Sequence, residues 1–371
     1  MNREERRKNA AKQRPSNSKS SKDGAAKGRA YTTDARPTFE AASVSSGEDT
    51  SLASASSRSL FHYTNAHGLI GILRSGSLWA THSNFTNDAA ECQIMAEVLK
   101  PQIAEETEVL IEKLIERKLL REDVRTQRDI ADQQAQAALN ALQGAQRNIS
   151  PIYICSFCHH TEGSAEYDHG LLSQWRGYGN GFAIEFDELK IDRLAFLEGQ
   201  KHHYQGVLTD AVEYYDHKAR AKLDNLKGIA SAVNRKLFER SGQVYDDIFG
   251  PHQFDAEYVK AYLGPLPFLK HPGFSAENEY RIAALADRPR TSDVPDGKTF
   301  KKVHFRSNAG TGIVTPYIEL FSDLNEPLPI KSILVGPHSN QDHQEEAIEL
   351  LLEQYAPGIE VRRSGLTFRN L

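Results

Sequence analysis

The chain has 371 residues, 39% of them hydrophobic and 26% charged, which is the balance of a globular protein able to bury a core. Residues 1–58 carry 12 Lys and Arg against 7 Asp and Glu, and the remainder carries 33 against 43, so the net charge of −5 hides a basic tail and an acidic body. The acidic body argues against broad, nonspecific nucleic-acid binding, and no apolar run approaches the roughly 18 residues of a membrane-spanning helix.

The three cysteines, Cys92, Cys155 and Cys158, are too few for a disulfide framework, and the basic N-terminal stretch lacks the apolar centre of a secretory signal. We therefore expect a cytoplasmic protein with no membrane association. Residues 1–58 are rich in Ser, Ala, Lys, Arg and Gly, so we expect a disordered basic tail. Its cations offer a contact for nucleic acid or another anionic partner, although a solubilising role is the simpler interpretation.

Residues 59–371 are predicted to form a single α+β domain with one mixed β-sheet. The first strand covers residues 60–64. Its last residue or Asn65 caps a helix over residues 66–75, and Gly76 ends that helix. This compact opening leads into a second, aromatic strand.

Two blocks, about 89–146 and about 210–249, have helix-forming composition and apolar residues at helical spacing. We expect them to be helical insertions, the first a hairpin with a break at Pro101. Further strands are expected at 78–81, 153–157, 181–186, 279–284, 301–305, 315–320, 330–335 and 359–363, and a helix at 341–355.

Cys155, Cys158 and His159 have the spacing of a haem attachment motif, and two cysteines with nearby histidines could ligate zinc. Residues three apart in a strand point to opposite faces, however, and no second ligand pair has suitable spacing. We therefore expect no metal site.

Two polar groups stand near the start of the domain. A lone histidine such as His62 is more often a satisfied polar residue than a catalyst, but the strand, cap, helix, glycine and aromatic strand around it form a specific arrangement. Asn87, Asp88 and Glu91 gather at a predicted helix start, where they form either a ligand site or a simple cap with acidic first-turn residues.

The most unusual stretch is residues 173–181, Ser-Gln-Trp-Arg-Gly-Tyr-Gly-Asn-Gly. Its three glycines allow a close backbone approach or left-handed turns. Trp175 and Tyr178 offer flat faces for stacking on a ring, and Arg176 offers a bidentate donor for phosphate. The alternative is an aromatic-rich hairpin turn that leads into the next strand.

In a strand, Glu277, Glu279 and Arg281 would share one face. Two neighbouring carboxylates repel each other, which tends to raise the pKa of at least one, and Arg281 would oppose that shift. Such a trio can stabilise a developing positive charge or orient a hydroxyl. It is equally compatible with a solvated sheet face.

Taken in chain order, these segments resemble a bacterial family known as domain of unknown function 2971 (DUF2971). The chain departs from the family pattern at Cys155 and Cys158, which flank Ser156-Phe157 where the family has small polar residues. Its tail and first insertion are also longer than is usual in the family. The segments that carry the resemblance are Leu60-Phe-His-Tyr-Thr64, Trp79-x-x-x-x-Asn84-x-x-Asn87-Asp88-x-x-Glu91, Ser156-Phe157, Leu172-x-x-Trp175-x-x-Tyr178 with Gly181-x-x-Ile184-x-Phe186, Glu277-x-Glu279-Tyr280-Arg281, Pro316-Tyr317-Ile318 and Ile333-x-Val335-Gly336-Pro337.

The opening strand, helix and Gly-x-Leu-Trp also look like those of ADP-ribosyltransferase-type domains, which implies a split sheet and NAD as co-substrate. By that likeness His62 contacts the ribose hydroxyls, Tyr178 or Trp175 stacks on nicotinamide, and Glu279 holds the nicotinamide-ribose 2′-hydroxyl. Glu277 would orient or deprotonate a macromolecular acceptor. Loss of nicotinamide leaves an oxocarbenium-like cation, which a fixed carboxylate stabilises.

Such a protein would be a glycosyltransferase, as in a toxin or phage-defence effector. A different class of function is a non-catalytic nucleotide or nucleic-acid sensor, in which aromatic rings stack on a base and the tail adds salt-sensitive affinity. A metal-dependent hydrolase acting through the Asn87 group is a third interpretation. The expected ligand contacts are Tyr63, Asn87, Asp88, Glu91, Trp175, Arg176 and Arg281.

Overall fold

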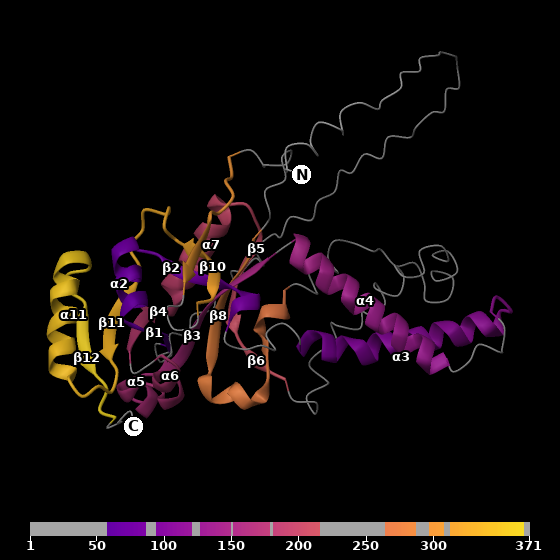
Figure 1. Cartoon of the computed structure of the whole chain (residues 1–371), viewed down its shortest axis with the longest axis horizontal. Coiled ribbons are helices and arrows are strands. Elements are labelled where there is room, and N and C mark those ends of the chain that lie inside the picture. The colour runs from indigo at the N-terminus through magenta and orange to yellow at the C-terminus, as the bar shows by residue number, and fades with distance from the viewer. Residues whose placement is uncertain are drawn as a thin grey trace, which may run out of the picture. The chain divides into compact units, whose positions relative to one another are not determined.

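An α+β fold built around one large mixed β-sheet makes up the described part of the chain (Figure 1). The basic tail predicted for residues 1–58 lies outside the described residues apart from Arg58, as does most of the second predicted insertion. The computed structural model describes residues 58–86, 94–120, 127–149, 151–178, 181–215, 264–286, 297–307 and 312–366.

Ten strands of the described residues form the sheet, and their pairings are antiparallel except for one. They are β1 (Arg58–Thr64), β2 (Leu78–His82), β3 (Ile152–Thr161), β4 (Phe182–Asp187), β5 (Tyr204–Ala211), β8 (Glu279–Ala286), β9 (Val303–Ser307), β10 (Val314–Leu320), β11 (Ile330–Val335) and β12 (Glu360–Arg363). Eight follow the order β12–β11–β4–β1–β3–β2–β10–β9, while β8 pairs with β3 and β5 pairs with β8. The parallel pair is β11 with β12, so the predicted mixed sheet is confirmed.

The sheet branches at β3. Along one edge, β3 pairs with β1 from Thr161 to Cys158 and with β2 at Ile154 and Tyr153. Residues 155–157 have no strand partner on this edge among the described residues. Along the other edge, β8 pairs with β3 without interruption. The strands β1 and β2 therefore separate from each other beside residues 155–157.

Helices cover both faces of the sheet. One face packs against α2 (Ala66–Ser75), α7 (Glu188–Lys201) and α11 (Gln341–Tyr355). The other packs against α3 (Ile94–Glu116) and α4 (Gln127–Ile149), which lie side by side in Figure 1, and against α5 (Ala165–His169) and α6 (Leu172–Gly177). The remaining elements are the 3-10 helices η1 (Ser83–Phe85), η4 (Leu266–Phe268) and η5 (Pro272–Glu277) and the two-stranded pair β6 (Glu213–Tyr214) and β7 (Leu269–Lys270).

The helix α2 forms where its caps predict it. The Asn65 side chain accepts a hydrogen bond from the Gly68 N–H at 3.0 Å, which satisfies one of the free donors of the first turn. Gly76 ends the helix in the left-handed conformation at φ 60°. The helix buries Leu69 and Ile72 against the sheet and so fixes the direction in which the chain leaves β1.

The first helical insertion is confirmed as the hairpin of α3 and α4, but the predicted break at Pro101 is wrong. Pro101 lies inside α3, where it removes one backbone hydrogen bond at a typical cost of about 3 kcal/mol. On both sides of it, Leu99, Ile103 and Ala104 are buried in the core that α3 shares with α4. That packing holds the helix together across the proline.

The second helical insertion does not begin at residue 210, because Asp210 and Ala211 belong to β5. This strand pairs with β8 along its whole length and satisfies backbone groups that would otherwise be free at the edge of the sheet. Edge pairing thus overrides the helical composition. Residues 216–249 of the predicted block lie outside the described residues.

A buried carboxylate ties together strands that are distant in sequence. Glu185 on β4 accepts hydrogen bonds from Ser59 Oγ at 2.7 Å and Ser332 Oγ at 2.6 Å. It also pairs with Lys331 at 2.9 Å and Arg362 at 3.1 Å. Burial raises the pKa of Glu185, but the hydrogen bonds from Ser332, Lys331 and Ser59 outweigh this and hold it below its usual value.

Acid should weaken the fold through His160, which is buried beside Tyr63 with 2.8 Å between its Nε2 and the tyrosine hydroxyl. Burial lowers the pKa of His160 from 6.5 to about 4. The unfolded chain therefore binds a proton that the folded chain does not, and the free energy of unfolding falls as the pH falls through this range.

Urea unfolding at a series of pH values between about 7.5 and 5 measures this fall in the free energy of unfolding. The window is chosen because most carboxylates titrate below it. We expect the free energy of unfolding to fall less steeply with falling pH in His160→Gln than in the unaltered chain. The matched control is His343→Gln, on the exposed side of α11. Equal slopes in all three proteins would contradict the expectation.

Candidate functional site at the branch of the sheet

His62 lies where the sheet branches. Its Nδ1 is 2.8 Å from the carbonyl oxygen of Ser156, which belongs to the stretch of β3 without a strand partner on that edge. The Sγ of Cys155 is 4.0 Å from the same nitrogen, and the ring of Phe157 lies 5.6 Å from the imidazole. A side chain rather than a neighbouring strand therefore satisfies the Ser156 carbonyl.

This contact sets the chemistry of His62. A carbonyl only accepts hydrogen bonds, so Nδ1 carries the proton and Nε2 presents a lone pair. Burial lowers the pKa of His62, the Ser156 hydrogen bond opposes this, and the charge of Arg306 adds to the lowering. The imidazole is therefore neutral at physiological pH, and its Nε2 can accept a hydrogen bond from a hydroxyl.

Tyr178 caps the C-terminal end of α6 and is 36% exposed. Burial of the hydroxyl raises its pKa to about 12, and the fields of Cys158, Glu279 and Glu277 act in the same direction. The hydroxyl is therefore protonated at neutral pH and lies within electrostatic reach of both carboxylates.

Residues 173–177 of the glycine-rich stretch are helical, in α6, rather than a hairpin turn, and residues 179 and 180 lie outside the described residues. Trp175 is 0% exposed: its Nε1 donates to the His169 carbonyl at 3.0 Å, and its ring lies 4.8 Å from that of Tyr63. A Cβ added at Gly170 would lie 2.4 Å from the indole, which shows how closely the backbone covers it. Neither face of Trp175 is open to a ligand in this arrangement.

The other residues predicted from this end of the site differ in exposure. Tyr63 is buried, and its hydroxyl accepts a hydrogen bond from the Leu171 N–H at 2.8 Å, besides contacting His160. Arg176 is exposed on α6. Asn87, Asp88 and Glu91 lie outside the described residues.

Glu279 is held by two cations. Its Oε1 accepts from Arg281 Nε at 2.7 Å, and its Oε2 accepts from Arg281 Nη2 at 3.0 Å and from Lys270 Nζ at 2.8 Å. Lys270 also donates to Glu277 at 2.7 Å. Glu279 is 4% exposed and Arg281 1% exposed. Burial raises the pKa of Glu279, but Arg281 and Lys270 outweigh burial and lower it, so Glu279 is ionised.

The predicted alternation of this segment holds for only two of its three charged residues. Glu279 and Arg281 share one face of β8, whereas Glu277 precedes the strand in η5. Asn278, between Glu277 and Glu279, has a left-handed backbone at φ 42°, so the extended conformation begins only after it. Lys270 on β7, which sequence analysis missed, bridges the two carboxylates instead.

His62 and Glu279 leave their strands on opposite faces of the sheet. His62 shares the face of Leu60, whereas Glu279 alternates with Tyr280, which packs in the same core cluster as Leu60. The strand β3 lies between β1 and β8. The strand β3 therefore separates Glu279 from His62.

Arg306 on β9 was also missed by sequence analysis, because the predicted strand ended one residue before it. Its Nη2 donates to Thr81 Oγ1 at 2.8 Å. The guanidinium carbon lies 5.7 Å from the ring centroid of Trp79 and 5.6 Å from that of Tyr317. Thr81 pairs with Ile154 on β3, two residues before the Ser156 that His62 contacts, so Arg306 lies beside the branch. The sequence signal for Arg306 was a lone cation in a strand, which is too common to single out.

Within the described ranges, no group of three or more His, Cys, Asp or Glu side chains is arranged to hold a metal ion. Cys155 and Cys158 pack in different core clusters, as strand alternation predicts. None of the helices in the described ranges combines the length and apolar character of a transmembrane segment.

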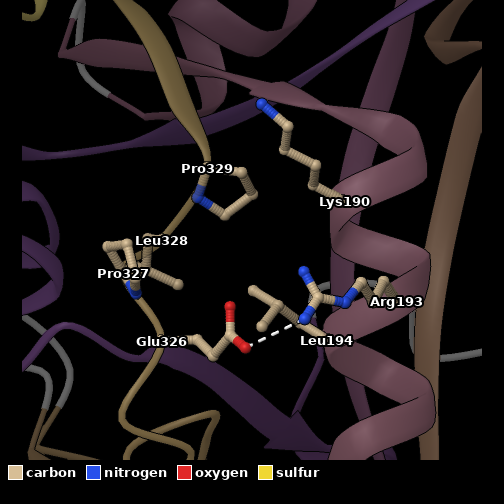
Figure 2. Close-up of a pocket in the computed structure, with 7 residues that line it drawn as sticks. All are labelled: Lys190, Arg193, Leu194, Glu326, Pro327, Leu328 and Pro329. Carbon is tan, nitrogen blue, oxygen red and sulfur yellow. Dashed lines mark hydrogen bonds and ion pairs between the residues drawn. The ribbon is translucent and has the colours of Figure 1, made fainter.

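A pocket of about 170 Å³ lies away from the branch, between α7 and residues 326–329 (Figure 2). Arg193 and Glu326 form an ion pair at 3.0 Å across it, and the rest of its wall is largely proline and leucine. The pocket contains none of the predicted site residues.

The family model described as "Protein of unknown function (DUF2971)" matches residues 174–282. This stretch includes most of α6, all of β4 and the start of β8, and it contains Tyr178, Glu277 and Glu279. No curated protein and no solved structure gives a significant match to the chain. The comparison therefore supports the resemblance to DUF2971 across residues 174–282.

Proposed function

We propose that the chain binds NAD at the branch of its sheet and is an ADP-ribosyltransferase-like enzyme with a macromolecular acceptor. The observation that carries the proposal is His62, a neutral imidazole whose Nε2 has no partner among the described residues. It lies beside the stretch of β3 that has no strand partner on that edge in the same ranges. A ribose hydroxyl is a donor that this nitrogen can accept. The partly exposed ring of Tyr178 adds a surface on which a nucleotide ring can stack.

The proposed reaction breaks the bond between ribose and nicotinamide. A positive charge then develops on the ribose, and a carboxylate fixed nearby stabilises it. Glu279 is ionised, which makes it the candidate for this role at the nicotinamide ribose. Because β3 separates Glu279 from His62, the hydroxyls that His62 contacts would be those of the other ribose of NAD. Glu277 is the more exposed of the two carboxylates and is the candidate for orienting the acceptor.

A second candidate function is a non-catalytic nucleotide sensor. The observation that favours it is that both oxygens of Glu279 are already bound by Arg281 and Lys270. Contact with a ribose hydroxyl would have to replace or share one of these bonds. His62 and Tyr178 bind a nucleotide in either function, so nucleotide binding is common to both and transfer is what separates them.

Calorimetric titration with NAD tests the shared part of the proposal. His62→Ala is expected to weaken NAD binding about tenfold, the effect of losing one hydrogen bond of about 1.4 kcal/mol. The exposed variant His343→Ala is the matched control and should bind as the unaltered chain does. Circular dichroism of His62→Ala checks that the fold survives loss of the Ser156 contact. Absence of NAD binding, or equal affinity in all three proteins, would overturn the proposal.

Release of nicotinamide from labelled NAD, in the presence of protein and nucleic-acid acceptors, separates the two candidates. An enzyme releases nicotinamide and labels an acceptor, and Tyr178→Ala reduces both. A sensor binds NAD with the same dependence on His62 but releases no nicotinamide. If the unaltered chain binds NAD but nicotinamide is released no faster than in a protein-free blank, the transferase function is wrong and the sensor function stands.

A further inference from the structure

Arg306 is partly buried and differs from four other buried or partly buried cations of the fold. Arg281, Arg362, Lys270 and Lys301 each form an ion pair with a carboxylate. No carboxylate of the described residues lies within ion-pair distance of Arg306. Burial lowers the pKa of Arg306, and Tyr317, Tyr178 and Cys155 oppose the change only in part. A partly buried cation without a counter-charge is costly, and proteins rarely keep one without a use for it.

The surroundings of Arg306 hold the guanidinium in place without neutralising it. Thr81 accepts one of its five donors, and the rings of Trp79 and Tyr317 pack against it. The remaining donors have no hydrogen-bond partner in the described part of the chain. A guanidinium positioned in this way is ready for a planar, bidentate contact with an oxyanion.

A second unsatisfied donor lies in the same neighbourhood. The indole Nε1 of Trp79, the ring against which Arg306 packs, is buried and has no hydrogen-bond partner among the described residues. The great majority of buried hydrogen-bond donors in proteins have a partner, so a buried donor without one needs an explanation. Two adjacent groups, both donors and one of them charged, indicate a missing acceptor with negative charge.

We propose that Arg306 is an oxyanion-binding residue of the branch site, and that it takes a phosphate group of the ligand. The inference deepens the proposed function, since it assigns the diphosphate of NAD to Arg306 and the ribose to His62. Arg306 donates to Thr81, which pairs in register with Ile154 on β3, and His62 contacts Ser156 two residues further along that strand, so Arg306 and His62 flank the same stretch of β3. Free inorganic pyrophosphate offers the same chemistry as the diphosphate of NAD, and the test separates the two.

The test titrates the full chain with ADP-ribose, with adenosine and with inorganic pyrophosphate. Arg306→Met is expected to weaken ADP-ribose binding about tenfold to a hundredfold, because a charge-assisted bidentate contact is lost. Adenosine, which has no phosphate, should bind equally well to both proteins. Arg306→Lys keeps the charge without the planar fork and should fall between them. The control is Arg193→Met, because Arg193 lies on α7 and forms an ion pair with Glu326.

Thermal unfolding of the ligand-free proteins excludes a merely structural role. A structural arginine destabilises the chain when it is removed, whereas an oxyanion-binding arginine without a counter-charge does not. We expect Arg306→Met to melt no lower than the unaltered chain. A clear drop in Tm together with unchanged ADP-ribose affinity would overturn the inference.

The failure of this inference is distinguishable from that of the proposed function. If ADP-ribose and NAD bind with the same affinity to Arg306→Met, the oxyanion role is wrong and the nucleotide site stands. If neither nucleotide binds but pyrophosphate does, and Arg306→Met abolishes that binding, the inference stands and the proposed function fails. If none of the three ligands binds the unaltered chain, both are wrong.

Discussion

Replacing Glu279 with Gln is expected to lower the free energy of unfolding by about 3–5 kcal/mol. The substitution keeps the shape of the side chain but removes the charge that Arg281 and Lys270 share. Arg281 is 1% exposed, so water cannot take the place of the carboxylate. Removing one partner of a buried ion pair lowers the free energy of unfolding by far more than the pair itself contributes to it, because the remaining charge stays buried.

Urea unfolding followed by circular dichroism measures this change. The matched control is Glu277→Gln, which removes a more exposed carboxylate and leaves Lys270 paired with Glu279. We expect the control to cost about 1 kcal/mol or less. The double variant Glu279→Gln/Arg281→Met should lose less than the sum of the two single changes, since neither charge is then left alone. A Glu279→Gln protein as stable as Glu277→Gln would contradict the assigned network.

The same network complicates any test of catalysis at Glu279. Loss of activity in a Glu279 variant follows from a role in transfer and equally from loss of the fold. Activity of such variants is therefore informative only at a temperature where their folded state has been verified. For this reason His62 and Tyr178, which carry no buried ion pair in the described residues, are the first positions to vary.

Replacing Trp175 with Ala is expected to destabilise the chain by about 3–5 kcal/mol. The indole is fully buried between Tyr63 and the backbone at Gly170, and its N–H is bonded to His169. Removing it leaves a cavity and an unsatisfied carbonyl. Because Trp175 anchors α6, the change should also loosen the helix that ends at Tyr178.

Thermal and urea unfolding measure the loss. Tyr178→Ala, at the C-cap of the same helix and 36% exposed, is the matched control and should change the free energy of unfolding by less than about 1 kcal/mol. Trp175→Phe keeps most of the ring and should lie between the two. A Trp175→Ala protein with unchanged stability and lost NAD binding would instead favour the stacking role predicted for this residue from sequence.

Local signals in the sequence located much of the fold. The helix α2 was predicted with its bounds, because a capping asparagine, an apolar stripe and a terminal glycine all agree. The helix α11 was likewise predicted with its bounds. The core strands β3, β4 and β8 were predicted from short runs of β-branched and aromatic residues. In these segments the local preference and the tertiary structure coincide.

The prediction failed where tertiary contacts decide the conformation. The strand β5 is part of the sheet because β8 offers a free edge, and α7 was missed between two better-marked elements. The glycines of the 173–181 stretch suggested turns, whereas the burial of Trp175 holds residues 172–177 in a helix. None of these outcomes is encoded in a window of a few residues.

The candidate site was only partly predictable for the same reason. His62 and Tyr178 were noticed because unusual local patterns surround them. Lys270 and Arg306 are single cations in ordinary segments, and their importance comes from what lies next to them in space. Sequence spacing also gave no sign that β3 separates Glu279 from His62.

The position of β4 has a consequence for how the chain acquires its structure during synthesis. This strand lies between β1, from the start of the domain, and β11, whose residues are translated about 150 positions after it. While the ribosome makes the intervening chain, one side of β4 has no neighbouring strand, and Glu185 lacks its partners Ser332 and Arg362. A high contact order of this kind slows folding and exposes an apolar strand edge to other nascent chains, so the protein is of a type that benefits from chaperones.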